Sequence, residues 1–375
     1  MFFLYASLII ATACSVITQR TLVGYNHVHW LLKLAVFGVF FASWCAPLIL
    51  GILRRKMWLE TELINFLTPL GYICFGFVFI LFVMLFLRDG FWFVFYRIWG
   101  HSENWNPVNI AALTKANIVT VILAVVVSSY AYYEGTKLPQ IKKIELTSDK
   151  IKYPVTLLQI NDVHLHGSKP VAAVRKLVNL ANSLQPDIIV MPGDIIDDSV
   201  GNLAQHLQEL AKLQAKYGVY VSGGNHEYYN GLVPCQWQFQ QMGFNLLSEN
   251  GQQIEETGLY LAGIPDNPSN RQKKDYPQIL QNSLPNMYKI LLAHNPSLAK
   301  DYLKLGFDLQ LSAHTHGGQI FPFHILVKVA NKYLSGKYNI DGKVLYISNG
   351  AGYWGPPMRL FAPSDITLIT LKPKK

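Results

Sequence analysis

Acidic residues are missing from four long apolar stretches of this chain. The stretches cover residues 2–18, 28–53, 63–87 and 108–133. Proton and ion transporters carry ionisable groups inside their membrane spans, so the sequence gives no support for a transporter. Each stretch approaches the ~20 residues that a helix needs to cross a bilayer. Together with 51% hydrophobic residues overall, they predict an all-α transmembrane region of about four helices.

Cysteine is also scarce, with 4 residues in 375. Three of them, Cys14, Cys45 and Cys74, lie in the apolar stretches, where cysteine acts as a small apolar residue. Cys235 is the only cysteine after residue 133, so that part of the chain cannot form an internal disulfide. This fits a reducing compartment without requiring one. The chain also lacks internal repeats and low-complexity tracts.

Basic residues gather beside the apolar stretches. In a multi-pass arrangement, one side of the membrane would hold Arg54, Arg55, Lys56, Lys137, Lys142, Lys143, Lys150 and Lys152, and the other Arg20, Arg88 and Arg97. Because cytoplasmic loops carry the excess of basic residues, we expect a multi-pass protein of the cell membrane whose C-terminal domain is cytoplasmic. The formal net charge of +9 is then explained by topology and anionic lipid, and no nucleic-acid partner is expected.

Three regions follow from these patterns. We expect a transmembrane region over residues 1–133, a polar linker with one edge strand over 134–152, and a soluble α/β domain over 153–375. Residues 91–99 are rich in aromatics but too short to span, and we place them at the membrane–water boundary. A cleaved signal peptide is the alternative for the first stretch, although it lacks a basic leading segment.

Five short polar motifs occur in the soluble part, each closely following an apolar, strand-like run. They are Asp162-Val163-His164, Gly193-Asp194-Ile195-Ile196-Asp197, Gly224-Asn225-His226-Glu227, a lone His294, and His314-Thr315-His316. In α/β sheets, ligands bind outside the carboxyl ends of the strands. Carboxylate, amide and imidazole groups together suit divalent transition metals. The order and placement of the motifs therefore predict one metal centre.

The motif set resembles the calcineurin-like metallophosphoesterase superfamily, in particular its bacterial membrane-anchored members. The runs His314–Phe323 and Trp354–Arg359 carry the closer part of this resemblance, which extends from about Val155 to the C-terminus. It implies a metallophosphoesterase-type β-sandwich flanked by helices. One departure is Ala313, where the family usually has glycine, and this substitution would strain the turn if a positive φ were needed there.

The resemblance also implies a ligand set for two divalent ions. Asp162, His164, Asp194 and His316 would hold one ion, and Asp194, Asn225, His294 and His314 would hold the other, with Asp194 bridging. Mn, Fe, Zn, Co and Ni all suit such mixed ligands. Asp162 and His164 lie two positions apart, which in extended chain would point both side chains to one face.

Two further residues are expected to act in catalysis. His226 resembles the family histidine that meets substrate and protonates the leaving group, and Asp197 would orient it by accepting its other ring proton. Asp197 as a turn cap is the alternative. Arg359 is a candidate for a substrate phosphate, with a surface ion pair as its alternative. Glu227 is expected to cap or pair locally.

These expectations describe a membrane-anchored binuclear-metal phosphohydrolase that cleaves a phosphodiester or pyrophosphate bond by attack of a metal-bridged hydroxide. The membrane region suggests a lipid-linked phosphate ester, because relatives include enzymes that cleave a UDP-sugar lipid, and this step rests on analogy. The alternatives are a tethered phosphodiesterase of soluble substrates and a catalytically inert membrane scaffold or sensor. Oligomeric state does not follow from the sequence.

Overall fold

The structure is a computed structural model that describes residues 2–24, 28–56, 60–99, 110–269, 276 and 278–374. The chain divides into two compact units. One, the helical unit, comprises Met1–Tyr133 and Gly355–Met358; the other, the α/β unit, comprises Glu134–Trp354 and Arg359–Lys375.

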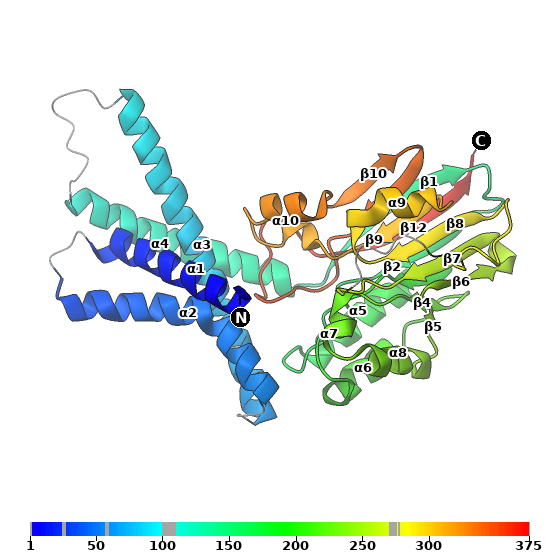
Figure 1. Cartoon of the computed structure of the whole chain (residues 1–375), viewed down its shortest axis with the longest axis horizontal. Coiled ribbons are helices and arrows are strands. Elements are labelled where there is room, and N and C mark those ends of the chain that lie inside the picture. The colour runs from blue at the N-terminus through cyan, green and yellow to red at the C-terminus, as the bar shows by residue number, and fades with distance from the viewer. Residues whose placement is uncertain are drawn as a thin grey trace. The chain divides into compact units, whose positions relative to one another are not determined.

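Four α-helices make up most of the helical unit (Figure 1). They are α1 (Phe2–Gln19), α2 (Trp30–Lys56), α3 (Thr61–Trp99) and α4 (Ile110–Thr136), with a π-helical turn at Arg20–Gly24. Each holds a segment long and apolar enough to cross a membrane, as the sequence predicts. Residues 91–99 differ from the expectation of a separate short segment, because they continue α3 without a break.

The helices of the helical unit, as far as the structure describes them, bury few side chains against one another. Buried apolar side chains from α2, α3 and α4 form one cluster: Phe40, Val78, Leu81, Leu85 and Ala124. At most 28% of each candidate membrane span is buried within the protein. The remaining apolar surface of these helices is therefore open to a surrounding apolar phase.

The first sheet of the α/β unit has six strands in the order β1-β12-β2-β3-β4-β5. Their bounds are β1 Gln140–Ser148, β2 Val155–Gln159, β3 Ile188–Met191, β4 Val219–Val221, β5 Asn245–Leu246 and β12 Asp365–Pro373. The strands β2, β3, β4 and β5 run parallel. The expected linker thus contains an edge strand, β1, which pairs in parallel with β12.

The second sheet also has six strands, in the order β10-β11-β9-β8-β7-β6. Their bounds are β6 Asn250–Ile254, β7 Leu259–Ile264, β8 Tyr288–Ala293, β9 Leu309–Ser312, β10 Gly336–Ile340 and β11 Lys343–Ile347. The strands β7, β8, β9 and β11 are parallel. Strands β5, β6 and β10 lack the long apolar runs by which the others are recognised in the sequence.

Helices flank the two sheets, and Figure 1 shows α5, α6 and α8 together on one side and α9 and α10 on the other. The helices are α5 Val171–Ser183, α6 Ala204–Leu210, α7 Asn225–Tyr229, α8 Leu232–Gln241, α9 Ala299–Lys304 and α10 His324–Asn331. Short 3-10 turns lie at Val200–Leu203, Glu255–Thr257, Pro296–Leu298 and His316–Gly318. Helix α6 ends at Leu210, and the chain then turns, with Gln214 donating its backbone N–H to the side chain of Asn182.

Alternate residues of the central strands serve two cores. Leu157 and Ile188 of the first sheet pack with Ile290 and Leu309 of the second, which makes the sandwich. Their neighbours Leu158 and Ile189 face away, into a cluster with α5, α6 and α8 that includes Leu177, Leu207 and Phe239. Successive side chains of a strand point to opposite faces, so strands buried on both sides read as continuous apolar runs.

Candidate metal centre

The polar motifs follow neighbouring parallel strands in both sheets. Asp162, Asp194 and Asn225 come after β2, β3 and β4, which are adjacent in the first sheet. In the second sheet, His294 follows β8 and the motif His314-Thr315-His316 follows the adjacent β9. The carboxyl ends of adjacent parallel strands lie at one edge, so each sheet contributes donors to a common place between them.

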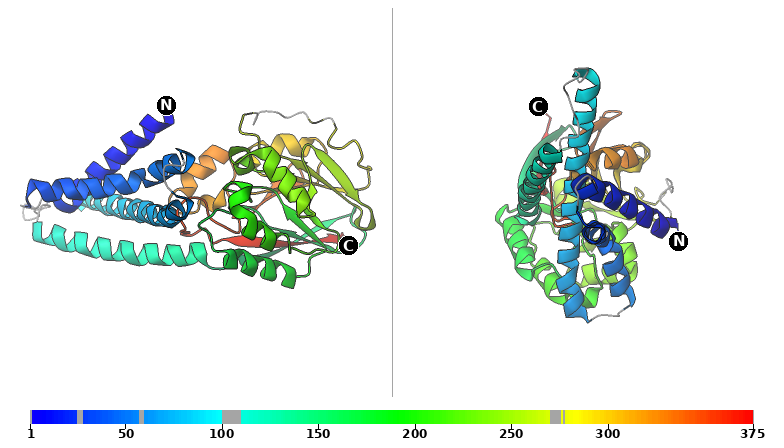
Figure 2. Two further views of the ribbon diagram at one scale, coloured as in Figure 1. Left: turned by 90° about the horizontal axis from the view of Figure 1, so that it is seen from below. Right: turned by 90° about the vertical axis from the view of Figure 1, so that its left-hand side faces the viewer.

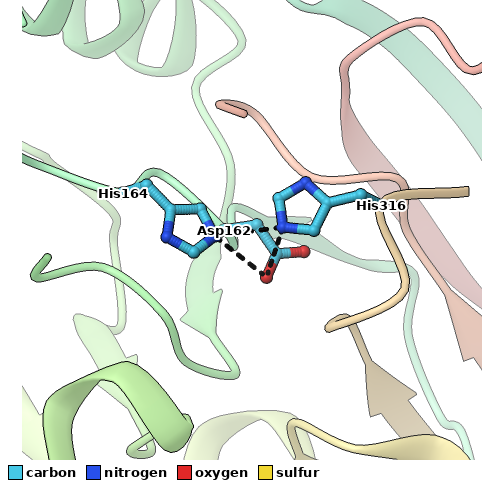
Figure 3. A group of neighbouring side chains, drawn as sticks. All are labelled: Asp162, His164 and His316. Carbon is cyan, nitrogen blue, oxygen red and sulfur yellow. Dashed lines mark hydrogen bonds and ion pairs between the residues drawn. The ribbon is translucent and has the colours of Figure 1, made fainter. Parts of the chain in front are cut away.

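One group of donors consists of Asp162, His164 and His316 (Figure 3). The Nε2 atoms of the two histidines lie 3.0 Å apart, and that of His316 lies 3.7 Å from Oδ1 of Asp162. Figure 3 shows both rings turned toward the carboxylate. All three side chains are buried. Three donor atoms so close together and shielded from water are suited to hold a cation.

A second group consists of Asp194, His294 and His314. Nε2 of His294 lies 2.9 Å from Oδ2 of Asp194 and 3.8 Å from Oδ1 of Asp162, so the two groups adjoin. The Oδ1 atom of Asn225 is buried and has no hydrogen-bond partner among the described residues. An orphaned buried oxygen is costly, and a bound cation would satisfy it.

Several of the candidate ligands have an unusual backbone conformation. Positive φ angles occur at Asp162 (49°), His164 (46°), Asp194 (53°), His314 (71°) and His316 (51°). Non-glycine residues seldom adopt this region, and such strain concentrates at functional sites. Asp162 and His164 therefore converge through a strained turn, not through the extended chain that we expected. Ala313 is not among the residues with positive φ, so its methyl group causes no strain.

The loops that carry Asp194 and Asn225 touch at two glycines. A Cβ at Gly224 would lie 2.1 Å from Oδ1 of Asp194, and a Cβ at Gly193 would lie 2.4 Å from the backbone nitrogen of Gly224. Gly193 also has a φ of 120°, which favours glycine. Only residues without a side chain let the two loops approach this closely.

Glu227 joins the same two loops. Its carboxylate accepts backbone hydrogen bonds from Gly224 (2.7 Å), Asp194 (3.1 Å), Ile195 (2.7 Å) and Ile196 (2.9 Å). The bond to Gly224 is the local cap that the sequence predicts. The bonds to residues 194–196 were missed, because nothing in the sequence shows that the two loops meet. Glu227 thus fixes the position of Asp194 without facing the donor groups.

Asp197 contacts two histidines with its two carboxylate oxygens. Oδ2 lies 3.2 Å from Nδ1 of His164, and Oδ1 forms a short hydrogen bond with Nδ1 of His226. A carboxylate can only accept, so each Nδ1 carries the proton. For His164 this leaves the Nε2 lone pair free for a cation. For His226 it directs Nε2 toward Oδ2 of Asp194, 3.9 Å away.

The charges of these groups shift several pKa values. Burial lowers the pKa of His226, but the hydrogen bond to Asp197 and the charge of Asp194 outweigh it and raise the pKa to about 9. For His294, burial is likewise outweighed by Asp194, and its pKa rises to about 10. Burial, followed by the nearby His164, holds the pKa of His316 well below its ordinary value. A neutral imidazole is the form that a metal ion requires.

Arg359 lies next to His316 and is fully buried. Its guanidinium donates to the backbone oxygens of Asn349 (2.8 Å), Gly352 (2.6 Å) and Ala362 (2.8 Å). It also donates to the backbone oxygen of His316 at 3.1 Å, and its Nη2 atom lies 3.1 Å from Nδ1 of the same residue. The guanidinium is thus directed at protein groups in this structure, not at a surface open to substrate or at a surface carboxylate. This differs from both expectations for Arg359 and gives it a positioning role.

Three further residues lie near the candidate ligands or His226, and the sequence predicted neither Trp354 nor Lys169 there. Tyr229 and Trp354 place their rings 5.4 Å and 6.4 Å from that of His226, and both are exposed. Lys169 donates to the backbone oxygen of Val163, and burial lowers its pKa to about 8. An aromatic wall and a lysine are general features of sequences, so no local pattern marks them.

The donor set fits divalent metal ions. Such ions take hard and borderline ligands. The site offers these as buried carboxylates, imidazole nitrogens and the unpartnered oxygen of Asn225. Six of the seven expected ligands belong to groups of donors that could hold a metal ion. A third such group is formed by His164, Asp194 and His226, so His226 also lies within reach of the donors.

Comparisons with known proteins point to one family. The family model of calcineurin-like phosphoesterases matches residues 155–318. An uncharacterized metallophosphoesterase of Campylobacter jejuni is 32% identical over 259 residues, which are 68% of this chain and 69% of that protein. One from Aquifex aeolicus is 31% identical over 67% of this chain and 98% of its own length. A Danio rerio protein described as a transmembrane protein with metallophosphoesterase domain is 27% identical over 82% of this chain and 74% of its own.

Proposed function

Because this chain belongs to the calcineurin-like phosphoesterase family, we propose that it is a membrane-anchored phosphohydrolase with two metal ions, which cleaves a phosphodiester or pyrophosphate bond. The observation that carries the proposal is the meeting of two donor groups. Asp162 and Asp194 lie in adjoining groups, and Nε2 of His294 is within 3.8 Å of both carboxylates. A site for a single ion would need only one of these two groups of donors.

The proposed ligands are divided between the two ions as the sequence analysis expects. Asp162, His164 and His316 would hold one ion, Asn225, His294 and His314 would hold the other, and Asp194 would contribute to both. When bound, two divalent ions would supply a water of lowered pKa and neutralise charge on the phosphate oxygens.

His226 is the proposed general acid. Its pKa of about 9 keeps the ring protonated near neutral pH, and Asp197 holds Nδ1, so Nε2–H is the proton that can move. Giving this proton to the leaving oxygen avoids the release of an alkoxide. Asp197 keeps the ring in place and stabilises its cationic form. Tyr229 and Trp354 border the ring and reduce its contact with water.

Membrane anchoring is supported by the surface of the helical unit. Side chains such as Ile9, Phe66, Ile122 and Val126 are each more than half exposed on helices long enough to span. Exposed apolar surface of this extent is unfavourable in water. With the positive-inside distribution of lysine and arginine, the proposed topology is multi-pass with a cytoplasmic α/β unit. A protease site introduced after Lys374 should be cut only in inverted vesicles, and cutting from outside intact cells would overturn this topology.

A membrane anchor favours a lipid-linked phosphate ester as the substrate, and a soluble diester hydrolysed by a tethered enzyme is the alternative. Full-length protein in detergent, loaded with Mn²⁺, should be tested on a lipid-linked nucleoside diphosphate and on its water-soluble headgroup analogue. Preference for the lipid-linked compound supports the first substrate class, whereas equal rates support the second.

Measurements of metal content and activity distinguish an enzyme from an inert scaffold. We expect two equivalents of Mn²⁺ by elemental analysis in the wild type, about one in Asn225→Ala, and a loss of activity in Asp194→Asn. His226→Ala should keep its metal and lose about 10²–10⁴-fold in rate. Metal-loaded wild type that hydrolyses no activated ester would contradict the proposed function.

A further inference from the structure

The helix α10 (His324–Asn331) presents its apolar side chains away from the protein. None of its residues is buried. Ile325, Leu326 and Val329 are 56%, 62% and 77% exposed. On an ordinary surface helix the apolar stripe faces the core and the polar stripe faces water, so α10 is oriented the other way.

The opposite face of α10 carries the contacts that hold it. The ring of His324 stacks on Phe321 with centroids 5.1 Å apart. His324 also lies against Gly318, where an added Cβ would come within 2.2 Å of its Cα. The outward orientation is therefore fixed by packing against the loop that carries His316.

A phenylalanine from another loop extends this apolar surface. Phe361 is 81% exposed, and its ring meets that of Phe321 edge-on at 5.8 Å. Its φ is 62°, a strained value for a bulky residue. A strained backbone that exposes a large apolar side chain to solvent does not stabilise the part of the protein that the structure describes. We call the surface made by Phe323, Ile325, Leu326, Val329 and Phe361 the α10 patch.

The charge of the segment that carries α10 is of one sign. Residues 309–340 include Lys328, Lys332 and Lys337 and contain no aspartate or glutamate. All three lysines are exposed. A short helix with outward apolar residues and flanking lysines has the composition of segments that lie in the surface layer of an anionic bilayer.

The chain keeps the start of β1 close to the end of α4. Only residues 137–139 separate the end of α4 at Thr136 from the start of β1 at Gln140. Figure 2 shows α4 as one unbroken helix. A connection of three residues spans at most about 11 Å, so the start of β1 stays close to the end of α4.

We propose that the α10 patch inserts into the headgroup region of an anionic bilayer and holds the metal centre at the membrane surface. The occupant is lipid, not a second copy of the chain, because the apolar residues are few, flanked by lysine and attached to loops that carry His316 and Arg359. The proposal rests on the membrane anchoring proposed above. It adds that the α/β unit itself binds lipid, so a membrane-resident phosphate ester would meet the site without leaving the bilayer.

Photo-crosslinking in full-length protein tests the α10 patch. The photoreactive residue p-benzoylphenylalanine would replace Val329 or Phe361 in protein reconstituted into vesicles of phosphatidylcholine with phosphatidylglycerol. Leu284 is the matched control, because it is 52% exposed and precedes β8, at the end of that strand opposite to His294. Ile122 of α4, 58% exposed, is the control for membrane anchoring. Mass spectrometry identifies the products.

We expect lipid adducts at Val329, Phe361 and Ile122, and none at Leu284. Lys328→Glu should reduce the adducts at Val329 in these vesicles but not in phosphatidylcholine alone. Lipid adducts at Ile122 without any at Val329 and Phe361 would overturn the inference and leave the anchor intact. Adducts within the chain or between two copies at Val329 would overturn it as well. No lipid adduct at Ile122 would contradict the anchoring itself. Melting temperatures of the probe variants should match the wild type, since all four sites are exposed.

Discussion

Nδ1 of His164 lies 3.2 Å from Oδ2 of Asp197, which is 33 residues further along the chain. The same carboxylate holds Nδ1 of His226 on its other oxygen. One side chain therefore sets the orientation of a candidate metal ligand and of the candidate acid. In the proposed mechanism, Asp197 would therefore couple metal binding to proton transfer.

Asp197→Asn should weaken both functions. An amide places an N–H opposite one histidine N–H, so one of the two contacts is lost. We expect metal affinity to fall about 10–100-fold, the usual effect of removing a partner of a ligand, together with a loss in kcat. Metal titration by calorimetry and steady-state kinetics measure the two effects. Asp198→Asn is the control, because Asp198 bonds to backbone at Gly167 and Ser199 and should change neither.

The protonation of His226 in the metal-free protein gives a prediction about pH. Its folded pKa of about 9 lies above the unfolded value near 6.5, so the folded state binds the proton more tightly. The resulting stabilisation is fully present below pH 6.5 and is lost as pH rises through about 9. Melting temperature of chelator-treated protein should fall over this range. Asp197→Asn should flatten the decline, and an unchanged slope would contradict the assigned contact.

Glu227→Gln should destabilise the protein without removing a metal ligand. Four backbone N–H groups donate to the carboxylate of Glu227, and the single oxygen of a glutamine amide cannot accept all four hydrogen bonds. Hydrogen bonds to a charged group contribute roughly 1.5–3 kcal/mol each, so we expect a loss of at least about 2 kcal/mol. Denaturation in detergent measures this. Exposed Glu256 provides the control in Glu256→Gln, which should have little effect.

Arg359→Met should affect both stability and His316. Removing the guanidinium leaves buried carbonyl oxygens at Asn349, Gly352 and Ala362 without donors, at roughly 1–3 kcal/mol each. It also removes one cause of the low pKa of His316, so protons should compete better with metal at low pH. The measurement is metal affinity against pH. A stability loss with an unchanged pH profile would reduce Arg359 to a purely structural residue. Exposed Arg175 is the control in Arg175→Met.

The sequence alone predicted those features that depend on the type of a residue and its position in the chain. Strands β2, β3, β8 and β9 are continuous apolar runs, and the polar residues that follow them were placed at one edge by the topology of parallel strands. The four apolar helices followed from length and composition. The family resemblance supplied the division of ligands, which geometry alone would have left open.

The rest depends on contacts between distant loops. The bonds of Glu227 to residues 194–196 and the burial of Arg359 require that particular loops meet, which no local pattern records. The end of α6 also depends on such a contact, since the side chain of Asn182 accepts a hydrogen bond from the backbone of Gln214 in the turn that follows. The outward apolar face of α10 also follows from packing, because its spacing alone is typical of a helix that covers a core.

The position of β12 has a consequence for how the chain is made. Asp365–Pro373 lies between β1 and β2 and pairs with both. During synthesis β1 emerges directly after the last apolar helix, yet its only partner among the described strands is translated last. Chains fold from the N-terminus as they are made, so β1 stays an open edge until β12 has been made. A nascent chain that stalls before residue 365 would therefore expose an unpaired strand, which is a signal that quality-control proteases could read.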